Sequence, residues 1–249
     1  MQPWPYPLWI AHRGAGKLAP ENTLAAFRVG AAHGQRAFEC DVKLSADGVP
    51  FLLHDATLER TAGVAGNAGA RDWAELSRLD AGAWHSPAYA GEPIPTLEAI
   101  ARFCLANGHA LNIEIKPTPG NEARTGRIVG ETAARLWAGA ALAPLLSSFR
   151  PEALAGARET APALPRALLV DTLWAGWFEV ACEFGCTAVV ANQRCMDAAL
   201  IARLHAAGLR ALVYTVNDAE RAQTLIDEGI DGIVSDAVDR FSPARGPGR

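Results

Sequence analysis

The sequence predicts an α/β protein and, within that class, a (β/α)8 TIM barrel with an insertion after the second strand. Short apolar, β-prone runs alternate with longer amphipathic stretches, which is the pattern of parallel βαβ units. Eight such runs occur within 249 residues. Eight units of roughly 30 residues give the size of a typical barrel. No linker or change in composition divides the chain, so we expect a single domain over residues 1–249.

The runs and the stretches follow one another regularly. The expected strands are Leu8–Ala11, Phe38–Val42, Leu111–Ile115, Leu145–Ser148, Ala167–Val170, Ala188–Ala191, Ala211–Thr215 and Gly232–Ser235. The expected helices are Glu21–His33, Leu97–Ala106, Glu122–Trp137, Pro151–Thr160, Met196–Ala207 and Ala219–Glu228. Glycines follow four of these helices, where a left-handed C-cap is expected: Gly34, Gly108, Gly208 and Gly229. Pro151 suits the first turn of a helix.

The chain after the second expected strand departs from this rhythm. Asp47-Gly48 lies between two alternating runs and is a strong hairpin signal, so Val49–His54 is expected to return as an extra strand. Residues 55–95 are rich in Gly and Ala, and they contain one short helical candidate, Asp72–Leu79. This segment is long for a loop in a compact domain, and long loops are often functional. We expect it to form an insertion over the barrel mouth.

Composition excludes several classes of protein. Hydrophobic residues make up 50% of the chain and charged residues 20%, with 23 Lys+Arg against 27 Asp+Glu and a net charge of −4. Such a chain is too apolar to be disordered, and it lacks the basic excess of a nucleic-acid-binding protein. Its apolar runs are too short to span a membrane, and the N-terminal residues show no secretory signal pattern.

The cysteines favour a reducing compartment. They are five in number and widely spaced: Cys40, Cys104, Cys182, Cys186 and Cys195. A secreted disulfide framework more often has an even, dense set. Cys182 and Cys186 would share a helix face at positions i and i+4, but no further ligand lies at zinc-finger spacing. We therefore expect free thiols in a cytoplasmic protein.

Two expected strands carry charged side chains on one face. Alternation places Glu39, Asp41 and Lys43 together on one strand, and Asn112, Glu114 and Lys116 together on another. A half-exposed antiparallel strand would show the same pattern. In a barrel, however, the apolar face packs against helices, so the charges point inward. Converging carboxylates repel one another unless a cation is present. Glu39, Asp41 and Glu114 therefore suggest a site for Mg²⁺ or Ca²⁺.

Two histidines are expected near this cluster. His12 ends the first strand and is followed by Arg13, whose planar guanidinium can bind phosphate oxygens. His54 ends the extra strand. Together with Lys116 these residues form a plausible acid–base arrangement around a phosphodiester. We interpret Glu21 as an acidic residue in the first turn of a helix. Asn22 and Thr23 fit equally well as helix-cap residues or as residues that support the site.

At this point the sequence resembles the glycerophosphodiester phosphodiesterase family, over His12 to about Asp236. The resemblance rests on the order of several motifs: His12-Arg13-Gly14, Pro20-Glu21-Asn22-Thr23, Glu39-x-Asp41-Val42, Asp47-Gly48, His54-Asp55, Arg60-Thr61, Glu114-Ile115-Lys116, Tyr214-Thr215-Val216-Asn217 and Gly229-Ile230-Asp231-Gly232-Ile233-Val234-Ser235-Asp236. It implies a barrel of the phospholipase-C-like phosphodiesterase type. It also implies hydrolysis of glycerophosphodiesters, such as glycerophosphocholine or glycerophosphoethanolamine, to sn-glycerol 3-phosphate and an alcohol.

The resemblance also implies roles for individual residues. Glu39, Asp41 and Glu114 would bind the metal, and His12 and His54 would act as general acid and base. Arg13 and Lys116 would neutralise the phosphate. By analogy, a glycerol hydroxyl attacks phosphorus first and water then resolves a cyclic intermediate. Phe149 and Tyr214 end two strands and are candidates for an apolar wall against glycerol.

Two alternative functions stay open at the level of sequence. One is a lysophospholipase D-like phosphodiesterase, which would need a wide apolar surface for an acyl chain. The other is a non-catalytic barrel that binds phosphate or a lipid headgroup, since a fold alone does not establish activity. A small-molecule phosphodiester is the expected partner, and the sequence leaves the oligomeric state open.

Overall fold

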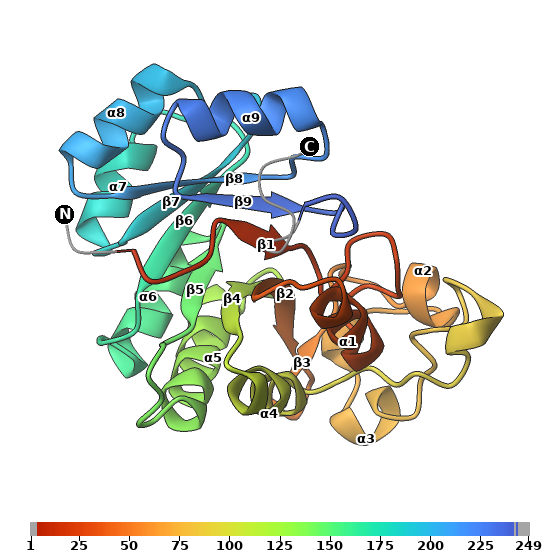
Figure 1. Cartoon of the computed structure of the whole chain (residues 1–249). Helices are drawn as coiled ribbons and strands as arrows, with labels where there is room; N and C mark the ends of the chain where they lie inside the picture. Colours follow the sequence, from red (N-terminus) through yellow and green to blue (C-terminus); the bar gives the residue numbers. More distant parts are fainter. Residues whose placement is uncertain (1–3, 242, 244–249) are drawn as a thin grey trace.

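The computed structural model describes residues 4–241 and 243, and it shows a barrel of parallel strands surrounded by helices (Figure 1). The strands are β1 Trp9–Ala11, β2 Ala37–Leu44, β3 Pro50–Leu52, β4 Ala110–Ile115, β5 Leu145–Ser148, β6 Arg166–Val170, β7 Ala188–Asn192, β8 Arg210–Tyr214 and β9 Gly232–Ser235. Strand β1 closes the barrel because it pairs in parallel with β9 through Trp9 and Ile233, and with β2 through Ala11 and Phe38. The predicted (β/α)8 barrel is confirmed.

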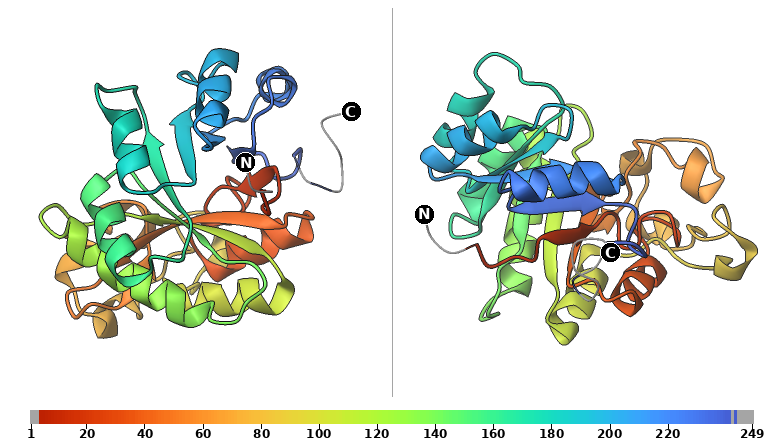
Figure 2. Two further views of the ribbon diagram at one scale, coloured as in Figure 1. Left: turned by 90° about the vertical axis from the view of Figure 1, so that its left-hand side faces the viewer. Right: turned by 45° about the horizontal axis from the view of Figure 1, so that its top comes forward.

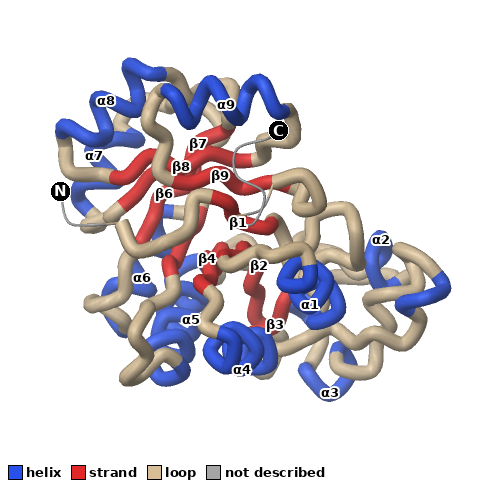
Figure 3. The backbone as a smooth tube through the Cα atoms, viewed as in Figure 1, coloured by secondary structure: helices blue, strands red, loops and turns tan. Residues whose placement is uncertain are grey.

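The helices lie outside the strands, as Figure 2 and Figure 3 show from different sides. Six of them correspond to the predicted stretches: α1 Leu24–Ala32, α4 Leu97–Asn107, α5 Glu122–Leu136, α6 Pro151–Thr160, α8 Ala198–Ala206 and α9 Ala219–Asp227. The four glycines after predicted helices all have positive φ, from 63° at Gly108 to 90° at Gly229. These positions favour glycine because a Cβ would be strained there.

Helix α7, Trp177–Glu183, was not among the predicted stretches. It is short, and no side chain caps its N-terminus, so the usual start signal is absent from the sequence. It also corrects the expectation for two cysteines. The helix ends before Cys186, which is buried, whereas Cys182 is exposed. The two side chains therefore do not share a helix face.

The alternation of side chains along β2 has the predicted consequence. Phe38, Cys40 and Val42 are buried in the cluster that includes helix residues Phe27 and Ile100. The opposite face points into the barrel. Toward the other end of the barrel the interior is apolar, and it is filled by residues including Ile10, Ala37, Ala110, Leu145 and Leu212. The charged side chains of β2 and β4 are therefore confined to one end.

The hairpin predicted after β2 is present. Strand β3 pairs antiparallel with β2, with Val42 opposite Leu52, although it is shorter than the predicted Val49–His54. The segment that follows contains the short helices α2 Glu59–Ala62 and α3 Trp73–Leu76, and 3-10 turns at Ala68–Ala70 and Pro87–Tyr89. It has an apolar cluster of its own, which includes Leu58, Leu76 and Ile94 and packs on Phe51 of β3. In Figure 1 this segment lies at the right, beside β2 and β3.

No helix among the described residues is both long and apolar enough to cross a lipid bilayer.

Candidate active site

Three carboxylates meet inside the barrel. Strands β2 and β4 are neighbours, and their register places Asp41 opposite Glu114. One oxygen from each of Glu39, Asp41 and Glu114 lies within 4.8 Å of the others, and all three residues are buried. The adjacent strands and the shared inward face produce this cluster, as the alternation in the sequence indicated.

Two basic side chains hold the carboxylate cluster together. Nζ of Lys116 lies 2.9 Å from Oε1 of Glu114 and 3.2 Å from Oδ1 of Asp41. Nε of Arg13 lies 3.3 Å from Oδ2 of Asp41, and the Arg13 backbone N–H donates to Oε2 of Glu39 at 3.0 Å. Arg13 has a φ of 49°, which turns the chain sharply after β1. Two positive side chains therefore converge on the place where the carboxylates meet.

The three carboxyl groups differ in their affinity for protons. Burial and the charge of Asp41 raise the pKa of Glu39 to about 8. Burial and Asp41 also raise the pKa of Glu114, although Lys116 opposes the shift. Burial acts in the same direction on Asp41, but Lys116 and Arg13 outweigh it and hold the pKa of that carboxyl well below its usual range. Of the three carboxyl groups, Asp41 therefore loses its proton most readily.

The donor set fits a hard divalent cation. All three groups offer carboxylate oxygens, the ligands that such ions prefer. Oε1 of Glu39 and Oδ1 of Asn112 are buried and have no hydrogen-bond partner among the residues that the structure describes. Buried polar atoms are normally satisfied. Two oxygens without partners beside converging carboxylates are therefore consistent with a cation at this position.

His12 is oriented by Asp236, which directly follows β9. Nδ1 of His12 donates to Oδ1 of Asp236 at 2.6 Å, so Nε2 faces the carboxylate cluster, 3.8 Å from Oε2 of Glu39. Asn217 in turn donates to Oδ2 of Asp236 at 3.0 Å. Burial opposes a charge on His12, but the bond to Asp236 and the proximity of Glu39 prevail and raise its pKa.

His54 lies across the cluster, at the end of the hairpin. Its Nδ1 donates to Oδ1 of Asp55 at 2.8 Å, and Nε of Arg60 donates to Oδ2 of Asp55 at 2.6 Å. Arg60 also donates two hydrogen bonds to Glu21, of 2.7 and 2.8 Å. Burial lowers the pKa of His54, and the nearby Lys116 and Arg13 act in the same direction although Asp41 opposes them.

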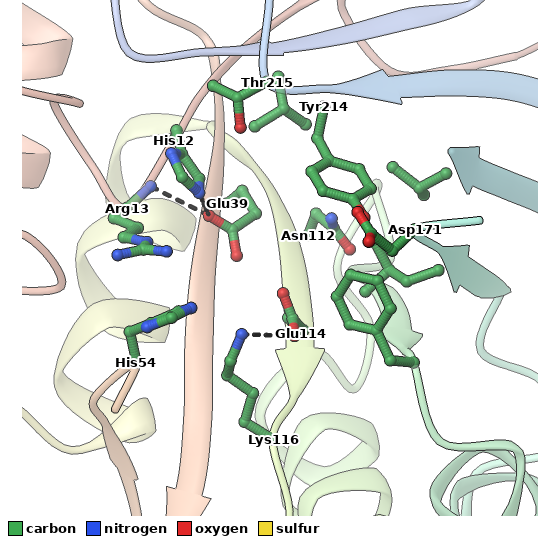
Figure 4. A pocket seen from close by; sticks show the side chains of 14 residues that line it. His12, Arg13, Glu39, His54, Asn112, Glu114, Lys116, Asp171, Tyr214 and Thr215 are labelled. Atoms are coloured by element: carbon green, nitrogen blue, oxygen red, sulfur yellow. Dashed lines mark hydrogen bonds and ion pairs between the residues drawn. The ribbon is translucent and has the colours of Figure 1, made fainter. Parts of the chain in front are cut away.

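These groups open into one cavity of about 260 Å³. Figure 4 shows His12 and His54 pointing into it from one side, with Glu39, Glu114 and Lys116 between them and the opposite wall. That wall contains Tyr214 and Asp171, whose carboxylate accepts from the Tyr214 hydroxyl at 3.3 Å. Phe149 packs edge-on against Tyr214, with 5.7 Å between ring centroids. The cavity thus has a charged side and a partly aromatic side.

The structure brings together every residue that the sequence analysis singled out for the site. The full set is His12, Arg13, Glu39, Asp41, His54, Glu114, Lys116, Phe149 and Tyr214. Of these residues, Asp41 alone does not line the cavity, because it lies beneath Arg13 and Lys116.

Several supporting residues were missed or misassigned from the sequence. Glu21 was expected in the first turn of a helix, but it precedes α1 and pairs with Arg13 at 2.8 Å. Thr23 is the helix cap, whereas Asn22 donates to Oδ2 of Asp41 at 2.7 Å. Asp171 had no motif around it, and only the fold places it in the cavity.

Comparisons with known proteins agree with this geometry. The model of the glycerophosphoryl diester phosphodiesterase family matches residues 12–240. The protein YhdW of Bacillus subtilis is 32% identical over 238 residues, which cover 92% of this chain and 94% of that protein. The glycerophosphodiester phosphodiesterase of Caldanaerobacter subterraneus is 30% identical over 233 residues, with 92% and 93% of the two chains covered.

A solved structure is also similar over nearly the whole chain. It is that of a phosphodiesterase from Oleispira antarctica in complex with the product sn-glycerol 3-phosphate. It superposes with a TM-score of 0.89 at 35% identity, covering 94% of each chain. Since the family model spans the strands that carry the carboxylates and the insertion alike, the chain described here belongs to the glycerophosphoryl diester phosphodiesterase family.

Proposed function

We propose that the chain hydrolyses small glycerophosphodiesters to sn-glycerol 3-phosphate and an alcohol, with a divalent cation. One observation carries the proposal: two histidines, each hydrogen-bonded to its own carboxylate, face a buried cluster of three carboxylates in one cavity. A protein that only bound phosphate would need the basic side chains of Arg13 and Lys116, but it would not need two oriented histidines. Such pairs are typical of general acid–base catalysis.

Glu39, Asp41 and Glu114 would hold the cation, and Mg²⁺ or Ca²⁺ fits their oxygen donors. When bound, such an ion polarises a phosphoryl oxygen and makes an adjacent hydroxyl more acidic. Lys116, which bridges Asp41 and Glu114, and Arg13 are placed to neutralise the negative charge of the phosphodiester. Phe149 and Tyr214 would pack against the carbon side of the glycerol.

The partners of the two histidines favour different roles. Asp236 stabilises the protonated form of His12, whereas burial and the neighbouring cations favour neutral His54. We therefore assign His54 as the base that takes the proton from the attacking glycerol hydroxyl. His12 is the acid that gives a proton to the departing alcohol oxygen. The first step forms a P–O bond and breaks the P–O bond to the alcohol, and water then opens the cyclic phosphodiester.

The test is a coupled assay for glycerol 3-phosphate over a panel of headgroups, with EDTA and metal add-back. We expect activity to disappear with EDTA and to return with Mg²⁺ or Ca²⁺. His12→Ala and His54→Ala should each lower kcat by about 10²–10⁴-fold. Near wild-type turnover in either variant would remove the role assigned to that histidine. Binding of a phosphodiester without any turnover would favour the non-catalytic alternative.

We also propose that the protein functions in the reducing cytoplasm. All five cysteines are free in the structure, and Cys40, Cys104 and Cys186 are buried. Free thiols are typical of proteins kept under reducing conditions. Titration of the protein purified from its native cells without reductant, and then denatured, should detect five thiols. A lower number would indicate disulfides and argue against this compartment.

A further inference from the structure

We propose that a second cavity binds the departing alcohol, and that it favours an uncharged polyol over a quaternary ammonium headgroup. The inference rests on the proposed hydrolysis of glycerophosphodiesters. The second cavity has a volume of about 440 Å³, and its walls include Lys17, Glu21, Trp84 and His85. Trp84 and His85 belong to the insertion, and Lys17 to the loop after β1.

The two cavities meet at the catalytic groups. His12 and Arg13 line both of them, whereas His54, Glu39 and Glu114 line only the first. In phosphoryl transfer the attacking and leaving oxygens lie on opposite sides of phosphorus, roughly in line. A phosphate held by Arg13 at the junction would therefore direct its two alcohol groups into different cavities. His12, at the junction, is within reach of the leaving oxygen.

The glycerol group matches the first cavity. That cavity is the smaller, and it offers the Asp171 carboxylate, the Tyr214 hydroxyl and the Asn112 amide to the hydroxyl groups of glycerol. His54 also lines this cavity, so a glycerol hydroxyl bound there lies beside its imidazole. The second cavity is larger and contains neither His54 nor a member of the carboxylate cluster. The departing alcohol is thus assigned to the second cavity.

The aromatic wall of the second cavity is fixed in place. Nε1 of Trp84 donates to the carbonyl of Ala81 at 2.8 Å, and Nε2 of His85 donates to the carbonyl of Lys17 at 3.0 Å. The two rings pack edge to face, with 5.7 Å between centroids. Trp84 nevertheless remains 40% exposed. A rigid, exposed indole is a suitable surface for the C–H face of a polyol.

The charges around this wall disfavour a cationic headgroup. Both carboxylates of the cavity already have partners, since Glu21 binds Arg13 and Arg60, and Asp236 binds His12. The guanidinium of Arg60 lies 5.6 Å from the centre of the Trp84 ring. Lys17 forms no ion pair within the part of the chain that the structure describes. An incoming ammonium group would therefore meet like charges, whereas polyol hydroxyls can accept from Lys17.

The first experiment compares kcat/KM for glycerophosphoinositol with that for the methyl ester of glycerol 3-phosphate, which lacks a large alcohol. Truncation of Trp84 removes the apolar ring surface against which the polyol would pack. Trp84→Ala should therefore lower kcat/KM for glycerophosphoinositol, relative to that for the methyl ester, by about two- to tenfold. The change should come mainly from a higher KM for glycerophosphoinositol. Trp84→Phe should preserve most of the ratio. Trp174→Ala is a matched control, because Trp174 is also 40% exposed but lines neither cavity.

The second experiment reverses the charge of the cavity. The wild-type enzyme should have a higher kcat/KM for glycerophosphoinositol than for glycerophosphocholine, and Lys17→Glu should shift that preference severalfold toward choline. A preference for choline in the wild type, or an unchanged ratio in Trp84→Ala, would overturn the assignment while the hydrolase function stands. Absence of glycerol 3-phosphate from every diester, including the methyl ester, would instead refute the proposed function.

Discussion

Replacing Asp236 by Asn removes the carboxylate that orients His12 and stabilises its protonated form. The bond between Nδ1 of His12 and Oδ1 of Asp236 is 2.6 Å long. A hydrogen bond to a charged group contributes about 1.5–3 kcal/mol. Because the carboxylate stabilises protonated His12 more than neutral His12, its loss should lower the pKa of His12. The Asn side chain can also turn its amide toward Nδ1 and favour the other tautomer.

The expected result follows from the sign of this shift. As the proposed acid, His12 must be protonated, so the basic limb of the kcat profile should move to lower pH in Asp236→Asn. At neutral pH kcat should fall roughly 10–100-fold, because the same interaction energy is lost from the acid. The assay is release of glycerol 3-phosphate measured across pH, with thermal unfolding to confirm that the variant is folded.

A matched control exists within the same barrel. Asp231 also binds a histidine, with Oδ2 at 2.7 Å from Nε2 of His205, but it precedes β9 and lies outside the cavity. Asp231→Asn should lower thermal stability without moving the pH profile of kcat. If Asp236→Asn retained both its kcat and the position of its basic limb, the role of Asp236 in orienting His12 would be refuted.

Three further predictions concern the metal and the link to the insertion. Glu114→Gln should weaken Mg²⁺ binding by more than about tenfold in a titration of stripped protein, and unaltered affinity would exclude Glu114 as a ligand. Because the pKa of Glu39 is raised to about 8, a metal must displace its proton below that pH. Affinity should thus fall about tenfold per pH unit below pH 8, with proton release in weak buffer, and a pH-independent affinity would contradict this. Arg60→Ala should lower kcat about tenfold and leave metal affinity unchanged, since Arg60 binds Asp55, the partner of His54. An equal loss of kcat in Arg60→Lys would show that a positive charge alone does not position Asp55.

Much of the site follows from local pattern. Alternation along β2 and β4 determines that Glu39, Asp41 and Glu114 point away from the helices, because the apolar faces must be buried. The Asp-Gly pair determines the hairpin that carries His54 back toward β2. These inferences succeed because they depend on the period of a strand and on the backbone preferences of a turn.

Other features depend on residues that are distant in the sequence. Asp236 reaches His12 over 224 positions because β9 and β1 are adjacent when the barrel closes. Glu21 departs from its expected helical role because Asn22 adopts a φ of 58° and bonds to Asp41 before the helix begins. Neither contact has a local signal in the sequence.

The sequence by itself determined the order of the strands, the inward face of each and the chemical character of the cavity. Only the tertiary structure decided how charge is distributed there. Glu39 and Asp41 are two residues apart on one strand face, yet their pKa values shift in opposite directions. The physical reason is that Arg13, which follows β1, and Lys116, which follows β4, lie close to Asp41, while Glu39 is buried beside a neighbouring negative charge.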